Sequence, residues 1–195
     1  MLGDYDAVTE YVENYQAGGK NIVDVPNDAR AYHWLAYVAM VHGNLLETKR
    51  LCLKAITAYE ACGLKGYAGL VYGLLALAVW RLGYTAKSWF YLQKGQRGQL
   101  VFLGNWLCAP FAAVLLADSG RYEEAVSAYA CATNHPMVAN SVWYKDIAGK
   151  VVQTAESKLE PWAVEKARRH ALESDPVQMA EELLELVDEI ALECI

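Results

Sequence analysis

The sequence predicts an all-α protein, a right-handed superhelix of helical hairpins that repeat with a period of about 37–40 residues. The first observation is a series of glycines at positions 3, 43, 83 and 120, spaced 40, 40 and 37 residues apart. The second is that an amphipathic segment follows each glycine, and an alanine stands seven residues before three of them. Helices commonly end on a glycine because the residue there adopts a left-handed backbone. The repeated unit is therefore helix, glycine turn, helix.

The repeat phase places the elements along the chain in order. We expect helices over residues 4–16, 29–42, 45–61, 66–82, 85–96, 100–119, 122–134, 141–158, 160–173 and 174–193. They form one domain, 1–195, in which 28–62, 64–98 and 100–136 are hairpins and 138–195 holds C-terminal helices and a cap. Because Gly3 is a mid-unit turn, residues 1–16 are the second helix of a truncated or capping repeat. Pro110 either kinks its helix or marks a late start.

Composition favours a packed protein and disfavours a nucleic-acid binder. Hydrophobic residues make up 55% of the 195 residues and charged residues 21%, which is richer in apolar side chains than disordered chains are. The net charge is −6, with 17 basic against 23 acidic residues. The basic residues are scattered along the chain, so no basic surface for nucleic acid is predicted.

The cysteines and the N-terminus indicate a cytoplasmic protein. None of the five cysteines has the C-x-x-C spacing of a zinc or redox site, so we interpret them as reduced thiols, mostly small core residues. The first 15 residues are acidic and lack the basic start and apolar centre of a secretory leader. Apolar runs at 66–80 and 100–117 are interpreted as buried helices rather than membrane spans, since the first is short and the second contains Asn105 and Pro110.

No pattern of catalytic or metal-binding residues stands out, so the prediction is that the chain is not an enzyme and holds no metal or cofactor. The four histidines do not share metal-ligand spacing, and no nucleophile motif or P-loop occurs. The glycine-rich stretch 63–73 resembles a phosphate cradle only superficially, because its glycines continue into an apolar helix. Close packing between helices is the favoured interpretation of these glycines.

The stretch GRYEEAVSAYACATNHP, residues 120–136, resembles a tetratricopeptide repeat. It has the turn glycine, the aromatic, the two alanines at Ala125 and Ala132 with Tyr129 between them, and the terminal proline. The copies at Gly43 and Gly83 depart from this pattern, and the period exceeds the standard repeat length. Such long, degenerate repeats are similar to those at the C-terminus of bacterial STAND-type ATPases and of regulators like the maltose-regulon activator.

A longer segment, residues 107–152, resembles the C-terminal end of multidomain bacterial regulators, a likeness carried by Pro136, the run 138–141 and Trp143. The resemblance implies an interaction or sensor module of a larger transcriptional regulator or signalling ATPase. Its partner would be another protein or the switch domain of the same polypeptide. A small-molecule effector is the alternative that stays open, and a homo-oligomer is compatible with either.

In tetratricopeptide arcs, the first helix of each unit faces the concave groove. Projecting that phase onto this chain places seven candidate binding residues there: Arg30, His33, Tyr37, Met40, Trp80, Arg81 and Asp118. Aromatic side chains combined with arginine are typical of binding surfaces. The alternative is that Trp80 and Tyr37 simply pack between units.

Overall fold

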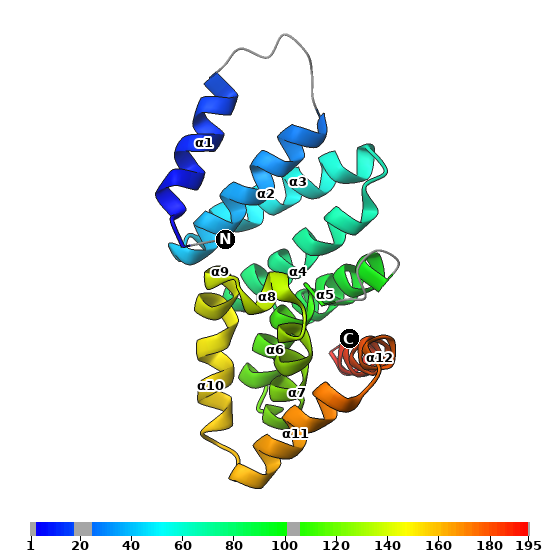
Figure 1. The fold of residues 1–195 in the computed structure, drawn as a ribbon. Helices are drawn as coiled ribbons and strands as arrows, with labels where there is room; N and C mark the ends of the chain where they lie inside the picture. The colour runs from blue at the N-terminus through cyan, green and yellow to red at the C-terminus, as the bar shows by residue number, and fades with distance from the viewer. Residues whose placement is uncertain (1–2, 18–24, 101–105, 195) are drawn as a thin grey trace.

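The computed structural model describes residues 3–17, 25–100 and 106–194. The secondary structure of these residues is entirely helical, and the helices stack as successive hairpins (Figure 1). The all-α prediction is confirmed. The stack of hairpins is consistent with a superhelix, whose right-handed, tetratricopeptide-like form stays a prediction.

The helices of the described residues follow the predicted order closely. They are α1 (Tyr5–Ala17), α2 (Val25–Val41), α3 (Leu45–Ala61), α4 (Lys65–Arg81), α5 (Thr85–Leu100), α6 (Ala109–Asp118) and α7 (Tyr122–Thr133). The C-terminal part comprises α8 (Pro136–Ala139), α9 (Val142–Tyr144), the π-helix η1 (Lys145–Gly149), α10 (Lys150–Glu156), α11 (Pro161–Glu173) and α12 (Pro176–Glu193).

The helix predicted over 100–119 is wrong at its start. Leu100 is the last residue of α5, residues 106–108 form a turn, and α6 begins only at Ala109. Pro110 lies in the first turn of α6, where its missing N–H and fixed φ are tolerated, whereas a position inside a long helix is not. The late start is therefore the correct alternative for Pro110. Residues 101–105 lie outside the described part of the chain.

The predicted glycine turns are confirmed. Gly3, Gly43, Gly83 and Gly120 all have positive φ, between 72° and 91°. At Gly43 the backbone N–H of Asn44 donates to Ala39 O and that of Gly43 to Met40 O, the paired bonds of a Schellman motif. The same two bonds recur at Gly83 and Gly120. The first helix of each of these hairpins therefore ends in the same Schellman motif.

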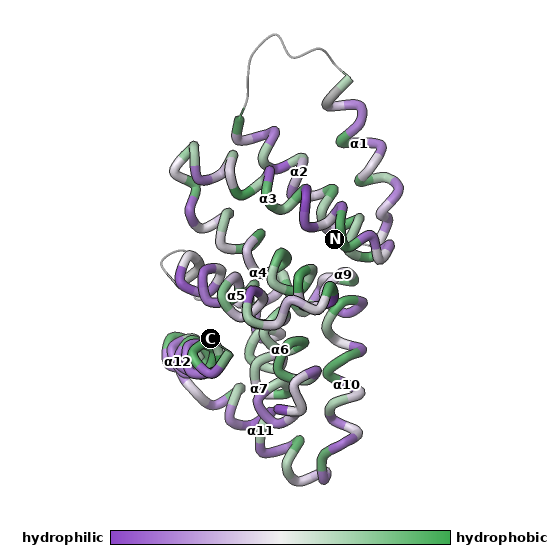
Figure 2. Tube along the Cα trace, turned by 180° about the vertical axis from the view of Figure 1, so that it is seen from behind, coloured by the Kyte–Doolittle hydropathy of each residue, from purple (hydrophilic) through white to green (hydrophobic). Residues whose placement is uncertain are grey.

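Glycines also let α4 and α5 approach closely, as the sequence indicated. A Cβ on Gly95 of α5 would lie 2.9 Å from Gly69 O and 3.0 Å from Gly73 N, both backbone atoms of α4. A Cβ on Gly73 would lie 2.5 Å from the ring of Phe111 in α6. Helices α4 and α6 are apolar along most of their length, whereas α5 and α11 carry many hydrophilic residues (Figure 2).

We expect Gly95→Ala to lower the free energy of unfolding by about 1–3 kcal/mol, because a backbone contact under 3 Å is relieved only by moving one helix. Urea denaturation followed by circular dichroism measures the change. The control is Ala86→Ser, an exposed position on the same helix, where the midpoint should stay unchanged. An unaltered midpoint in Gly95→Ala would contradict the close packing.

Candidate functional site

Three of the predicted groove residues, His33, Tyr37 and Met40, are buried, with 7%, 7% and 1% of their surface exposed. The expectation that they line an open face is therefore wrong. Trp143 packs edge-on against Tyr37, with ring centroids 4.3 Å apart, and its Nε1 donates a 3.1 Å hydrogen bond to the carbonyl oxygen of that residue. The segment of α9 thus occupies the space beside α2 that an open groove would need.

Trp80, Arg81 and Asp118 come together at the C-terminal ends of α4 and α6. Trp80 Nε1 donates a 2.8 Å hydrogen bond to Asp118 Oδ2, and its ring packs edge-on against Trp89 of α5. Arg81 Nη1 lies 3.5 Å from Met40 Sδ of the preceding hairpin. These contacts join neighbouring hairpins, which favours the alternative that Trp80 and Tyr37 pack between units. Arg30 is exposed near the start of α2, and a role for it in binding stays a prediction.

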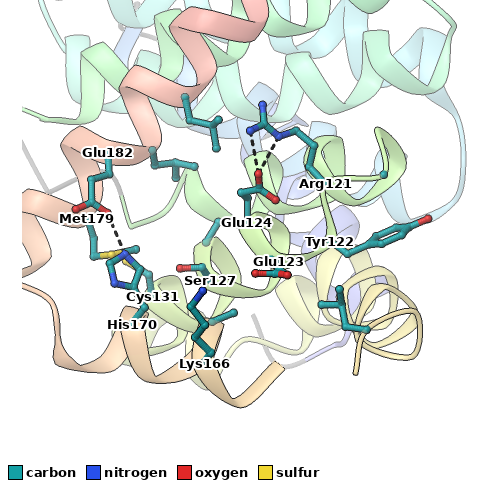
Figure 3. A pocket seen from close by; sticks show the side chains of 16 residues that line it. Arg121, Tyr122, Glu123, Glu124, Ser127, Cys131, Lys166, His170, Met179 and Glu182 are labelled. Atoms are coloured by element: carbon teal, nitrogen blue, oxygen red, sulfur yellow. Dashed lines mark hydrogen bonds and ion pairs between the residues drawn. The ribbon is translucent and has the colours of Figure 1, made fainter. Parts of the chain in front are cut away.

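A cleft of about 710 Å³ opens instead between α7, α11 and α12 (Figure 3). Its floor is apolar and consists of Ala128, Cys131, Ala167, Met179, Leu183 and Leu186. Its rim is charged and polar and includes Arg121, Glu123, Glu124, Ser127, Lys166, His170 and Glu182. An apolar cavity with a few polar groups around it is the usual form of a binding site.

The turn between α11 and α12 positions α12, which forms one wall of the cleft. Asp175 caps α12, since its Oδ1 accepts hydrogen bonds from the backbone N–H of Val177 at 2.8 Å and of Gln178 at 3.2 Å. From there α12 runs back to α5, where Asp188 accepts 2.7 Å bonds from Gln93 and Arg97. The N-terminal half of α12 therefore faces α7 and α11 without filling the space between them.

An ion pair and a histidine–carboxylate contact hold opposite sides of the rim. Arg121 donates bonds of 3.0 and 2.9 Å to Glu124 on one side, and His170 Nε2 lies 3.1 Å from Glu182 Oε2 on the other (Figure 3). Lys166 and Glu123 have no ion-pair partner within the described residues, so Lys166 can donate to an incoming polar group at the mouth of the cleft and Glu123 can accept from one. The cleft can therefore bind apolar surface at its floor and opposite charges at its edge.

Cys131 is the thiol that lines the cleft. Burial, with a smaller contribution from the charge of Glu182, raises the pKa of the Cys131 thiol to about 11, so the thiol stays protonated at neutral pH and is a poor nucleophile. Across residues 3–17, 25–100 and 106–194, no group of three or more His, Cys, Asp or Glu side chains is arranged to hold a metal ion.

The sequence did not predict this cleft. Residues 138–195 were predicted to be C-terminal helices and a cap, and none of the cleft residues was among the predicted binding residues. A usable signal was the strong amphipathic pattern of α12, because Met179, Leu183 and Leu186 on its apolar side line the cleft.

No family model matches the chain, and comparison with curated proteins and with solved structures finds no significant similarity. Within the described part of the chain, every helix is too short or too polar to cross a membrane.

Proposed function

We propose that the chain is a non-enzymatic helical-repeat binding module that holds an apolar segment of a protein partner in the cleft between α7, α11 and α12. The observation that carries this proposal is the open cleft of about 710 Å³ with its apolar floor and charged rim. Three helices surround it, and an amphipathic helix or extended peptide laid into such a groove buries its apolar face while its polar residues meet the rim. Lys166 and Glu123 would select the charges that flank that face.

The resemblance to C-terminal repeats of bacterial regulators suggests where the partner comes from. In such proteins the repeats act on a switch domain of the same polypeptide, and we propose a role of this kind in transcription regulation or signal transduction. The proposal for the cleft does not depend on whether the partner belongs to the same chain or another one.

A small-molecule effector is the second candidate, because the volume of the cleft lies within the roughly 300–1,000 Å³ that ligand pockets usually have. A thermal-shift screen with sugars and nucleotides distinguishes the two candidates. A reproducible rise in melting temperature with one compound, abolished by a substitution in the cleft, would favour the effector over the peptide.

Peptide selection from a random library displayed on phage, followed by affinity measurement with purified peptides, tests the proposal. We expect selected peptides to be amphipathic and to lose about tenfold in affinity, or about 1.4 kcal/mol, with Lys166→Glu or Leu186→Asn. The matched control is Leu192→Asn on the same helix, which is exposed and outside the cleft. Peptides that bind all three variants equally would place the site elsewhere.

A further inference from the structure

The outer sides of α3 and α5 form one continuous basic and aromatic surface, here named the lysine face. Its members are Leu46, Lys49, Leu53, Tyr84, Lys87, Phe90 and Lys94. The members on α3 and on α5 recur at helical spacing, so each set lies along one side of its helix. Lys49 of α3 and Lys87 of α5 both place their Nζ 5.6 Å from the ring centroid of Tyr84, which joins the two sides.

The lysine face carries uncompensated positive charge. Residues 45–100 contain eight Lys or Arg and two Asp or Glu. Both carboxylates are engaged, Glu47 with Arg50 and Glu60 with the hydroxyl of Tyr72. Within the described residues Lys49, Lys87 and Lys94 have no carboxylate in an ion pair, and each ammonium lies 5.0–5.6 Å from an aromatic ring instead. An exposed cation–π contact contributes only about 0.5–1 kcal/mol, so these lysines are available to a stronger anionic partner.

The chain also has an acidic helix, whose negative charge is complementary to the positive charge of the lysine face. Helix α12 contains six Asp or Glu and no Lys or Arg. Glu181, Glu185 and Glu189 are exposed and four residues apart, and we name them the acidic strip. Like charges at this spacing destabilise a helix by about 0.2–0.5 kcal/mol per pair. A basic surface packed on the strip would remove that repulsion.

The helix that carries the acidic strip packs against a helix that carries part of the lysine face. Helix α12 packs against α5 in both views (Figures 1 and 2), and Arg97 of α5 bonds Asp188 of α12 at 2.7 Å. That pair already shows a carboxylate of α12 docked on a basic residue of α5. Two neighbouring surfaces of opposite sign can pair with a second copy about a two-fold axis, so that each contact is made twice.

We propose that two copies of the chain form a symmetric dimer in which the acidic strip of each copy packs on the lysine face of the other. The exposed Leu53 and Phe90 add apolar contact within the lysine face, and Leu192 does so at the end of α12. The strip residues do not line the cleft, so the dimer leaves the cleft open and is independent of the proposed binding function. A nucleic-acid strand fits less well, because the neighbouring acidic strip repels phosphate.

Sedimentation velocity of the purified chain at low and high salt tests the dimer. At about 20 mM ionic strength, where screening is weak, we expect twice the monomer mass of 21.6 kDa, and at about 500 mM we expect the monomer. Lys87→Glu/Lys94→Glu and Glu185→Lys/Glu189→Lys should each be monomeric at low salt. An equimolar mixture of the two variants should dimerise again, because the reversed charges are complementary; this recovery also shows that both variants are folded.

Three outcomes overturn the proposal. The first is a wild-type chain that stays monomeric at low salt, and the second is a dimer that either charge-reversed variant leaves intact. The third is a monomer that binds a fluorescein-labelled single-stranded oligonucleotide through Lys87 and Lys94, which would assign the lysine face to phosphate. Arg169→Glu, an exposed charge reversal on α11 outside both surfaces, is the control and should dimerise like the wild type.

Discussion

Replacing Trp143 with alanine should lower the free energy of unfolding by about 3–5 kcal/mol, the usual cost of removing a buried aromatic side chain. Trp143 has no exposed surface, and its ring packs within 4.3 Å of Tyr37 and 5.9 Å of Phe111, measured between centroids. It joins α9 to α2 and α6, elements that are far apart in sequence. Urea denaturation at several wavelengths measures the loss and tests whether unfolding stays a single transition.

Two further variants separate the contributions of Trp143. Trp143→Phe keeps an aromatic ring but removes the Nε1 bond to Tyr37 O, so it should cost less than alanine while leaving that buried carbonyl unpaired. Trp162→Ala is the control, because that side chain is 65% exposed, and it should change stability by no more than about 0.5 kcal/mol. A loss below 1 kcal/mol in Trp143→Ala would mean that the C-terminal part does not hold the hairpins together.

Acid should destabilise the protein through His33 before the pH falls low enough to protonate most carboxylates. Burial lowers the pKa of this histidine from 6.5 to about 3. Its Nδ1 lies 3.5 Å from the hydroxyl of Tyr59, the ring packs on Tyr37, and Nε2 has no hydrogen-bond partner within the described residues. The neutral imidazole fits this cluster, whereas a charged one would lose its hydration.

The direction in which stability changes with pH follows from the number of protons that His33 binds in the folded and unfolded chains. Above pH 6.5 neither the folded nor the unfolded chain protonates His33, so the residue adds no pH dependence. As the pH falls from 6.5 towards 3, the unfolded chain binds a proton that the folded chain does not, and stability is lost at about 1.4 kcal/mol per pH unit. Between about pH 7 and pH 4.5 the loss should reach about 2–3 kcal/mol.

Comparison with His33→Phe isolates this effect, because the substitution removes the titrating group and keeps a ring in the cluster. The difference in unfolding free energy between wild type and variant should shift in favour of the variant by about 2–3 kcal/mol as the pH falls. His42→Gln is the control, since His42 is exposed at the end of its helix. A difference that stays flat with pH would show that His33 is accessible to protons in the folded state.

Local chemistry explains which parts of the fold the sequence could predict. A glycine after a helix needs only its own backbone and the preceding turn, so the turns at Gly43, Gly83 and Gly120 were predictable from spacing alone. The close packing of α4 against a neighbouring helix was also predictable, because the closely spaced glycines of residues 63–73 continue into an apolar helix. The start of α6 was left open between a kink and a late start at Pro110, because the apolar run continues on both sides of that boundary.

The features that could not be predicted from the sequence depend on contacts between residues far apart in the chain. Trp143 and Tyr37 are 106 residues apart, and nothing near either residue indicates that the first folds back onto the second. Three of the seven residues assigned to the predicted groove, His33, Tyr37 and Met40, are therefore buried in the structure. The cleft depends likewise on the return of α12 to α5 through Asp188, a contact across 91–95 residues that no repeat pattern encodes.

Hydrogen–deuterium exchange with a selected peptide bound tests most directly where the protein binds its partner. We expect slower exchange in α7, α11 and the N-terminal half of α12, the helices that line the cleft, and unchanged exchange in α2 and α4. Leu192→Asn should give the same pattern, and Lys166→Glu should weaken it. Protection confined to α2, α4 and α6 would contradict the cleft and return the binding site to the face on which Arg30, Trp80 and Arg81 were predicted.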